Sequence, residues 1–303
     1  MNIDLTTKIG ELRFKNPVLT ASGTFGYGLI MEEFSDVSLL GGIITKSITL
    51  KPKVGNPAPR IVETACGMLN SIGLENRGID NFLEDILPGI RRFKTNIIAS
   101  IAGKDEDEYG LLAERLDRQV SAIEVNISCP NVKEGGMSFG QDISSTKRVI
   151  KKVRMKTALP VIVKLTPNVT SIEDIAKVSE DNGADAVSLV NTYKGLSIDI
   201  SSRKPELGSF TGGLSGPAIK PLALYSIWKV AKNIDIPVIG CGGIMNFNDA
   251  IEFFMAGASL IEIGSATFRE PNAALKILKG IKHFLKTKKI KAIKEIVGTV
   301  NEN

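Results

Sequence analysis

Residues 160–192, PVIVKLTPNVTSIEDIAKVSEDNGADAVSLVNT, contain two short apolar runs separated by an amphipathic stretch. The runs at 160–167 and 186–192 are nearly continuous in apolar and β-branched residues, a pattern typical of strands buried on both faces. Between them, Ile172, Ile175 and Ala176 recur at helical spacing within 171–182. This stretch therefore predicts a strand, a helix and a second strand parallel to the first.

The same alternation extends in both directions along the chain. Six further apolar runs bounded by turn residues predict strands, at 17–23, 41–47, 96–103, 122–128, 236–243 and 259–265. The other helical stretches are at 81–94, 105–119, 144–157, 220–233, 247–256 and 272–287.

Eight strands that alternate with helices over about 250 residues favour an α/β fold with a single (β/α)8 TIM barrel across 1–303. An open doubly wound sheet is the alternative. Its nucleotide-binding versions lose support because no GxGxxG follows the first strand and no GxxxxGK[ST] occurs. Residues 3–16, with a turn at Ile9–Gly10, predict an N-terminal β-hairpin that closes the bottom of the barrel.

Composition excludes several classes of protein. The 303 residues are 43% apolar, enough for a packed core. Cys66, Cys129 and Cys241 form neither a disulfide framework nor a CxxC motif, which suits a reducing compartment. His283 is the only histidine, so multi-histidine metal sites and Ser-His-Asp catalysis are not expected, and we predict no metal.

The net charge of +5 comes from one end of the chain. Residues 276–294 hold eight lysines and no acid, and without them 30 basic residues face 33 acidic ones, a net charge of −3. A terminal helix with a solvated basic face explains this better than a nucleic-acid patch. With no signal-like or membrane-spanning run, we expect a cytoplasmic protein without a membrane or nucleic-acid partner.

Long connections follow the second, fourth and sixth strands, at 48–80, 129–143 and 193–219, on the face where barrels build active sites. Polar residues stand in or at the end of buried strands there: Lys46, Asn126, Lys164 and Asn191–Thr192. Alternation places Lys164 on the inner face of its strand. The alternative is that these lysines extend to solvent.

Glycine-rich turns follow the last two strands, at Gly240–Gly243 and Gly264–Ser265. Loops at these positions often bind phosphate in barrels, because glycines let backbone N–H groups approach an anion. Ordinary βα turns are the alternative. Residues 70–76, NSIGLEN, offer amide and backbone groups that suit a planar amide- or imide-bearing ligand, although a polar loop would look the same.

Cys129 directly follows the fourth strand and opens a long loop on the active face. A thiol with a pKa near 8.5 can serve as a base or nucleophile when its surroundings tune it. A buried apolar filler is the alternative. Among the three cysteines, spacing favours Cys129 over Cys66 and Cys241.

Together these segments resemble dihydroorotate dehydrogenase, specifically the catalytic subunit of the NAD-linked class 1B enzymes, from about residue 3 to residue 285. NISCPNV with NSIGL is specific for the family, and the stretches at 191–200 and 212–221 favour class 1B over fumarate-using relatives. The segments that carry the resemblance are NPVLTASGTFGYG (16–28), TKSITLKPKVGNPAPRIVET (45–64), NSIGLENRGID (70–80), VNISCPNV (125–132), VKLTPNV (163–169), NTYKGLSIDI (191–200), GGLSGPAIKPLAL (212–224) and CGGIMN (241–246).

The resemblance implies an FMN-containing (β/α)8 barrel that oxidises (S)-dihydroorotate to orotate in pyrimidine biosynthesis. Cys129 matches the catalytic base that removes the C5 proton while hydride leaves C6 for the flavin. Lys46 matches the lysine between flavin and orotate, and Lys164 the one beside the flavin N1–C2 edge, where a fixed cation stabilises negative charge.

The other implied contacts are carried over residue by residue. Two departures from the family pattern are Ser100, where many relatives have Asn, and Arg77, where Pro is common. The cofactor-binding residues implied are Ser22, Lys46, Ser47, Ser100, Asn126, Lys164, Val190, Gly216, Gly242, Gly243, Gly264 and Ser265. The substrate-binding residues implied are Lys46, Asn70, Ser71, Ile72, Gly73, Leu74, Asn126, Asn131, Asn191 and Thr192.

The class also implies a partner. A second subunit with FAD and a [2Fe–2S] cluster would pass electrons to NAD⁺, two such subunits joining a homodimer of this chain as a heterotetramer. The alternatives are a fumarate-linked single-subunit enzyme, another FMN barrel acting on a pyrimidine base or on tRNA dihydrouridine, and a flavin-free phosphate-binding or scaffolding barrel.

Overall fold

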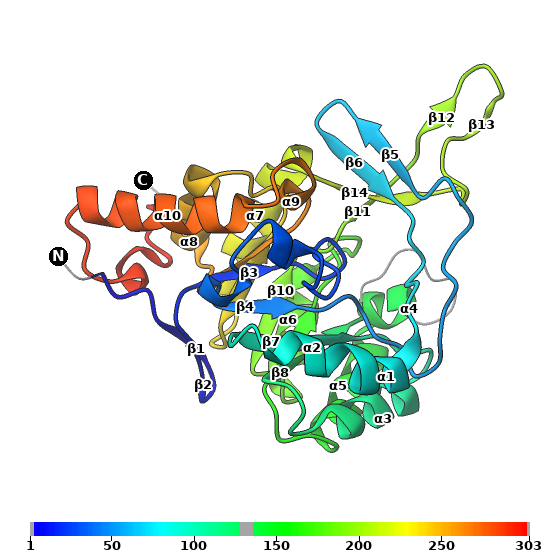
Figure 1. The fold of residues 1–303 in the computed structure, drawn as a ribbon, viewed down its shortest axis with the longest axis horizontal. Helices are drawn as coiled ribbons and strands as arrows, with labels where there is room; N and C mark the ends of the chain where they lie inside the picture. The colour runs from blue at the N-terminus through cyan, green and yellow to red at the C-terminus, as the bar shows by residue number, and fades with distance from the viewer. Residues whose placement is uncertain (1–2, 128–135, 302–303) are drawn as a thin grey trace.

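The computed structural model describes residues 3–127 and 136–301. At its centre is a closed barrel of parallel strands in the order β10-β15-β16-β3-β4-β7-β8-β9 (Figure 1). Each predicted apolar run contains one of them, which confirms the (β/α)8 fold. The strands are β3 (Val18–Thr20), β4 (Gly42–Ile44), β7 (Asn96–Ile101), β8 (Ala122–Asn126), β9 (Val161–Lys164), β10 (Ala186–Leu189), β15 (Val238–Cys241) and β16 (Leu260–Ile263).

Helices alternate with these strands, as predicted. Two 3-10 helices, η1 (Met31–Glu33) and η2 (Val37–Leu39), stand between β3 and β4, where no helical periodicity occurs. The stretch predicted as one helix at 81–94 has a π-helical turn, η3 (Phe82–Ile86), in its middle. The α-helices are α1 (Gly78–Asn81), α2 (Leu87–Arg91), α3 (Glu106–Leu116), α4 (Gly136–Gln141), α5 (Ile143–Arg154), α6 (Ile172–Asp181), α7 (Lys220–Ala231), α8 (Phe247–Ala256), α9 (Ala266–Arg269) and α10 (Ala273–Thr287).

The N-terminal end of the barrel is filled by apolar side chains. Strands β1 (Thr7–Ile9) and β2 (Leu12–Phe14) form an antiparallel hairpin there. Its Ile9 and Phe14 are fully buried in one cluster with inward-facing side chains of all eight barrel strands, among them Ile44, Ile98 and Ile162. This confirms the predicted hairpin that closes the bottom of the barrel.

Two residues further along each strand the inner face becomes polar. Because side chains alternate along a strand, the next inward-facing positions form one level above the apolar plug. We call this level the floor layer; it consists of Ala21, Lys46, Ser100, Glu124, Lys164, Ser188, Cys241 and Glu262. The barrel is therefore apolar at its closed end and polar where its C-terminal mouth begins.

A small antiparallel sheet that was not predicted lies beside the mouth, in the order β11-β14-β6-β5. It is built from the long connections after β4 and β10: β5 (Ile61–Thr64), β6 (Gly67–Asn70), β11 (Tyr193–Gly195) and β14 (Gly212–Ser215). A further hairpin of β12 (Ile198–Asp199) and β13 (Lys204–Pro205) projects beyond it (Figure 1). The connections that the sequence showed only as long loops thus carry their own sheet.

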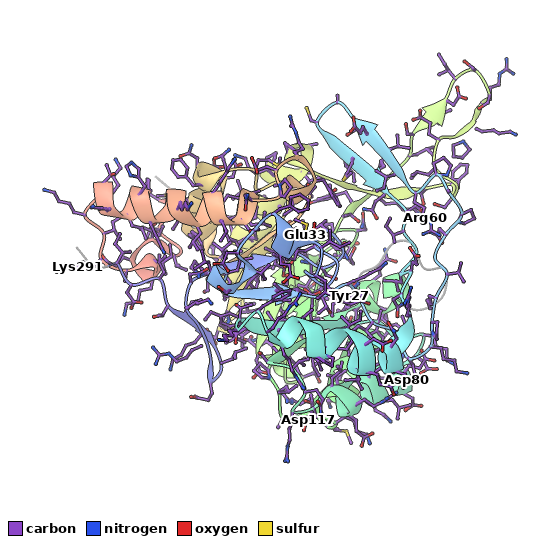
Figure 2. All side chains as sticks on the ribbon, in the orientation of Figure 1. Tyr27, Glu33, Arg60, Asp80, Asp117 and Lys291 are labelled. Atoms are coloured by element: carbon purple, nitrogen blue, oxygen red, sulfur yellow. The ribbon has the colours of Figure 1, made fainter. Side chains whose placement is uncertain are left out.

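The eight lysines of 276–294 are all exposed, while Ile277, Leu278, Ile281 and Leu285 of α10 are buried, as expected for a terminal helix with a basic outer face. Lys291 lies at the opposite end of the molecule from Arg60, which stands near the small sheet (Figure 2). The C-terminal end of the basic cluster is therefore distant from the small sheet. In the described part of the chain, every helix is too short or too polar to span a bilayer.

Candidate active site

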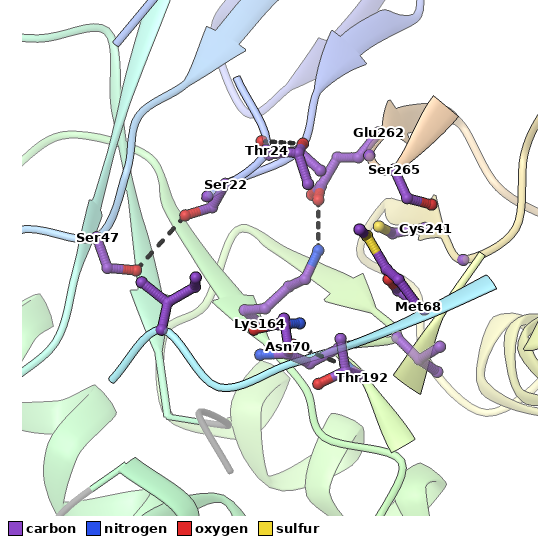
Figure 3. A pocket seen from close by; sticks show the side chains of 18 of the residues that line it. Ser22, Thr24, Ser47, Met68, Asn70, Lys164, Thr192, Cys241, Glu262 and Ser265 are labelled. Atoms are coloured by element: carbon purple, nitrogen blue, oxygen red, sulfur yellow. Dashed lines mark hydrogen bonds and ion pairs between the residues drawn. The ribbon is translucent and has the colours of Figure 1, made fainter. Parts of the chain in front are cut away.

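A cavity of about 410 Å³ opens at the C-terminal mouth of the barrel. Its base is made by residues of the floor layer, including Glu124, Lys164 and Glu262, and Met68 and Asn70 of β6 line another side of it (Figure 3). This volume falls within the range of about 300–1,000 Å³ usual for small-molecule and cofactor sites.

Most of the residues expected at a flavin and substrate site line this one cavity. Cys129 and Asn131 lie outside the described residues. Ser71 and Ser100 are described but do not line the cavity. Those that do are Ser22, Lys46, Ser47, Asn70, Ile72, Gly73, Leu74, Asn126, Lys164, Val190, Asn191, Thr192, Gly216, Gly242, Gly243, Gly264 and Ser265.

Ser100 and Ser71 are one step behind the cavity wall. The Ser100 hydroxyl is 2.9 Å from the hydroxyl of Ser47, which also accepts a hydrogen bond of 3.0 Å from Asn126 Nδ2. Ser71 Oγ accepts from Asn56 Nδ2 at 2.8 Å. Ser100 thus acts on the cavity through Ser47, which lines it, whereas Asn56, the partner of Ser71, does not line it.

The charged centre of the floor layer is an ion pair. Lys164 Nζ donates to Glu262 Oε2 (Figure 3). It also donates, at 2.9 Å, to Ser188 Oγ, and Ser188 donates in turn to Glu262 Oε1. Burial alone lowers the pKa of Lys164, but Cys241, Glu262 and Glu124 more than offset it and raise this pKa above its usual value. Lys164 is therefore a fixed cation at the base of the cavity, and its extension into solvent is excluded.

Glu124 lies in the same layer, and sequence reasoning missed it. Its side chain is fully buried, and neither carboxylate oxygen has a hydrogen-bond partner among the described residues. Burial, reinforced by the negative charge of Glu262 and opposed by Lys164, raises the pKa of Glu124 to about 7. An acid inside the apolar run AIEVNIS was the available signal, because alternation puts Glu124 on the same inner face as Asn126.

Neither of the two described cysteines is suited to act as a catalytic base. Cys66 is exposed in the turn between β5 and β6 and does not line the cavity. Burial raises the pKa of the Cys241 thiol to about 12, with Lys164 opposing this effect and Glu262 and Glu124 reinforcing it. Cys241 therefore faces the cavity as a neutral thiol near pH 7.

Amide and hydroxyl groups form the upper part of the cavity. Asn70 Nδ2 donates to the carbonyl of Gly213 at 3.2 Å, which ties β6 to β14. Asn168 Nδ2 donates to the Thr192 carbonyl at 3.0 Å. A Cβ on Gly213 would lie 2.0 Å from Thr192 Oγ1, so only glycine lets Thr192 occupy this position. The small sheet is what brings these polar groups together.

The loop at 70–76 contributes a second ion pair near the mouth. Glu75 Oε2 lies 3.9 Å from Lys46 Nζ and 2.8 Å from Arg60 Nη1. Both lysines line the cavity, but Lys46 is partly exposed whereas Lys164 is buried at its base. Arg77, one of the departures noted in the sequence, is exposed just before α1.

The glycine turns border the cavity on the side of β15 and β16. Gly243 has φ +76°, and a Cβ there would lie 2.8 Å from Lys220 Cβ and 2.9 Å from the Gly216 carbonyl. Gly264 and Ser265 follow β16, with Ser265 directly before α9. Gly23 and Thr24, which sequence reasoning missed, follow β3 beside these turns: a Cβ on Gly264 would lie 4.0 Å from Thr24 Oγ1, and a Cβ on Gly23 would point into open space. Exposed backbone from three neighbouring strand ends thus borders a space that a phosphate group could fill.

Within residues 3–127 and 136–301, no group of three or more His, Cys, Asp or Glu side chains is arranged so that it could hold a metal ion. The cavity instead combines one buried cation, amide groups and glycine turns.

Comparison with known proteins shows which family has this fold and this cavity. The family model for dihydroorotate dehydrogenase matches residues 4–285. Among similar curated proteins, the "Dihydroorotate dehydrogenase B (NAD(+)), catalytic subunit" of Desulforamulus reducens is 51% identical over 303 residues, covering 99% of this chain and all of that protein. Proteins of the same name from Bacteroides thetaiotaomicron and Thermodesulfovibrio yellowstonii are 50% and 51% identical, each over 98% of this chain and 99% of their own length.

These matches confirm the resemblance inferred from the sequence motifs. The fold, the cavity at the barrel mouth and the full-length similarity agree, and the chain belongs to the dihydroorotate dehydrogenase family.

Proposed function

We propose that this chain is the catalytic subunit of an NAD-linked dihydroorotate dehydrogenase and oxidises (S)-dihydroorotate to orotate in pyrimidine biosynthesis. The observation that carries the proposal is the convergence of the residues expected for flavin and substrate on one cavity at the barrel mouth. The name shared by relatives of about 50% identity supports the NAD-linked class.

The cavity fits FMN, the cofactor typical of this family. Lys164 offers a fixed positive charge at the base, where the N1–C2 edge of the ring would lie, and Ser22, Ser47 and Asn126 offer hydrogen-bonding groups beside it. The backbone at Gly242–Gly243 and Gly264–Ser265 would hold the phosphate. When bound, FMN would accept the hydride that leaves C6 of dihydroorotate.

The substrate would lie between Lys46 and the amide groups of the upper cavity. Dihydroorotate has a carboxylate and a planar imide, which call for donors and acceptors at fixed positions. Asn70, Asn191 and Thr192 supply such groups, with Asn126, Asn131 and the backbone at 71–74. Lys46 adds a positive charge that attracts the carboxylate. Binding by several fixed groups orients C5 and C6 for reaction.

Cys129 would remove the proton from C5. It lies in the segment that follows Ile127, and β8 brings the chain to the cavity at Asn126. Among the described cysteines, the alternatives are poor: the pKa of the Cys241 thiol is about 12, and Cys66 is away from the cavity. His283, the one histidine, is exposed on α10.

A second subunit would complete the electron path. We propose that it carries FAD and a [2Fe–2S] cluster, reduces NAD⁺, and joins a homodimer of this chain as a heterotetramer in the cytoplasm. The printed name "catalytic subunit" of the relatives supports a partner. This chain has no GxGxxG after its first strand, and its three cysteines are too few and too far apart for a cluster.

The test uses the purified chain loaded with FMN and mixed anaerobically with dihydroorotate. Flavin bleaching, followed by recovery of the oxidised spectrum with NAD⁺ only when the iron–sulfur flavoprotein is added, is expected. Recovery with fumarate alone would overturn the NAD-linked assignment. In Cys129→Ala, FMN and orotate should still bind while reduction slows by at least the ~10² to 10⁴-fold typical of losing a general base. Unchanged reduction would refute the role of Cys129.

A further inference from the structure

The buried charged side chains of the floor layer are two carboxylates and one cation, because Lys46, the other lysine of the layer, is partly exposed and lies 3.9 Å from Glu75. Lys164, Glu124 and Glu262 face one another inside the barrel, and all three line the cavity. With both glutamates ionised the three side chains carry a net charge of −1. With one of them protonated the net charge is zero.

The hydrogen bonds decide which glutamate holds the proton. Glu262 is bonded through both oxygens, to Lys164 and to Ser188, so its ionised form is stabilised. Glu124 is fully buried and has no hydrogen bond of good geometry, and the nearby Ser100 hydroxyl lowers its pKa by less than burial raises it. A buried carboxylate without a partner is costly in its ionised form and takes up a proton instead.

The groups that face Glu124 come from every neighbouring part of the layer. Of the two lysines in the layer, Lys164 on β9 acts on Glu124 but is already paired with Glu262 on β16, and Lys46 lies beside Glu75 instead. Cys241 on β15 is a neutral thiol near pH 7, and Ser100 on β7 carries no charge. The balance of burial and Glu262 against Lys164 leaves the pKa of Glu124 at about 7.

We propose that Glu124 is the charge-balancing residue of the active site: when negative charge arrives against Lys164, Glu124 takes up one proton from solution, so that the total charge around Lys164 stays at −1 instead of reaching −2. The inference rests on the proposed function, because the negative charge is that of the reduced flavin. The step is an acid–base one, in which a carboxylate and a proton give a carboxylic acid. The two electrons come from dihydroorotate and never reside on Glu124.

The pH range in which Glu124 can take up a proton follows from the sign of its interaction with the arriving negative charge. Below about pH 7 Glu124 already holds its proton before the negative charge arrives, so no uptake occurs. Above about pH 7 it is ionised at first and protonates when the charge appears, because an added negative charge nearby favours the neutral acid. We therefore expect Glu124 to take up a proton only above about pH 7.

The test measures the reduction potential of the bound FMN from pH 6 to pH 9. Each proton taken up with two electrons changes the equilibrium constant tenfold per pH unit, which equals ~30 mV. Above pH 7 the wild type should therefore be steeper than Glu124→Gln by ~30 mV per pH unit. Equal slopes in the two proteins would overturn the proposal.

Two further variants separate this role from a general effect of altered charge. In Glu262→Gln, Lys164 is free to pair with Glu124, so the steep region should begin at lower pH. Glu114→Gln changes an exposed glutamate paired with Lys156 and should match the wild type. A steep region lost in Glu114→Gln as well, or unmoved in Glu262→Gln, would contradict the assignment.

Infrared spectroscopy provides a readout without flavin. A protonated glutamate shows a carboxylic-acid carbonyl band that a carboxylate lacks, and this band should titrate near pH 7 in the wild type and be missing in Glu124→Gln. If the purified chain does not bind FMN, the proposed function fails while this titration still tests Glu124. If FMN binds and no such band titrates, the inference alone fails. Should Glu124→Gln not fold, the shifted titration in Glu262→Gln decides.

Discussion

Replacing Glu124 by Gln should change how the stability of the flavin-free chain depends on pH. Burial raises the pKa of Glu124 from its ordinary 4.5 to about 7. Between these values the folded protein keeps a proton that the unfolded chain has lost, so stability falls as pH rises from 4.5 to 7. The difference of about 2.5 pH units corresponds to ~3 kcal/mol at 1.36 kcal/mol per unit. Glutamine does not titrate and avoids this loss.

The assay compares thermal unfolding midpoints of the two proteins from pH 4.5 to pH 8. With an unfolding entropy of about 2.1 cal/mol/K per residue, ~3 kcal/mol corresponds to ~5 °C for 303 residues. The wild type should lose ~5 °C relative to Glu124→Gln over this range, whatever constant offset the substitution adds. Two parallel curves would show that Glu124 ionises normally in the folded protein and would refute the reasoning.

Three further changes have outcomes that follow from the geometry. Lys164→Met leaves two buried carboxylates without a cation, so it should lower the free energy of unfolding by about 3–5 kcal/mol at pH 8. The loss should be smaller at pH 5, where both carboxylates can protonate. Thermal unfolding at the two pH values measures the difference. Phe14→Ala should cost about 3–5 kcal/mol by opening the apolar plug, whereas Phe210→Ala at an exposed position should stay within about 0.5 kcal/mol, and equal effects would contradict the plug. Gly213→Ala places a Cβ against Thr192 and should weaken orotate binding by an order of magnitude or more while FMN still binds, as titration calorimetry would show.

The barrel itself could be predicted because the sequence pattern that marks each strand and helix lies within a few consecutive residues. Each barrel strand is a short run of β-branched and apolar residues buried on both faces, and each helix has an apolar face. The hairpin at 3–16 was also predictable, since Ile9 and Phe14 flank a turn. The small sheet was not, because β6 pairs with β14 across more than 140 residues and neither strand has an apolar alternation that would indicate it.

The site could be predicted where polar residues end a strand, and less well within a strand. Lys46 and Asn191–Thr192 stood out because they end predicted strands, and Asn126 and Lys164 stood out within theirs. Glu124 and Glu262 lie on the same inner face but were passed over, although an acid within each of the runs AIEVNIS and SLIEIGS is costly to bury. Their opposite hydrogen bonding, with Glu262 fully bonded and Glu124 without a partner, depends on strands far apart in the sequence and needed the structure.

The most direct test of the proposed activity is an anaerobic titration of the FMN-loaded chain with dihydroorotate, followed by the flavin absorption band and by the orotate formed. We predict complete bleaching with one orotate produced per flavin, before any partner subunit or NAD⁺ is added. A flavin that dithionite reduces but dihydroorotate leaves oxidised would contradict the assignment of this cavity as a dihydroorotate dehydrogenase active site.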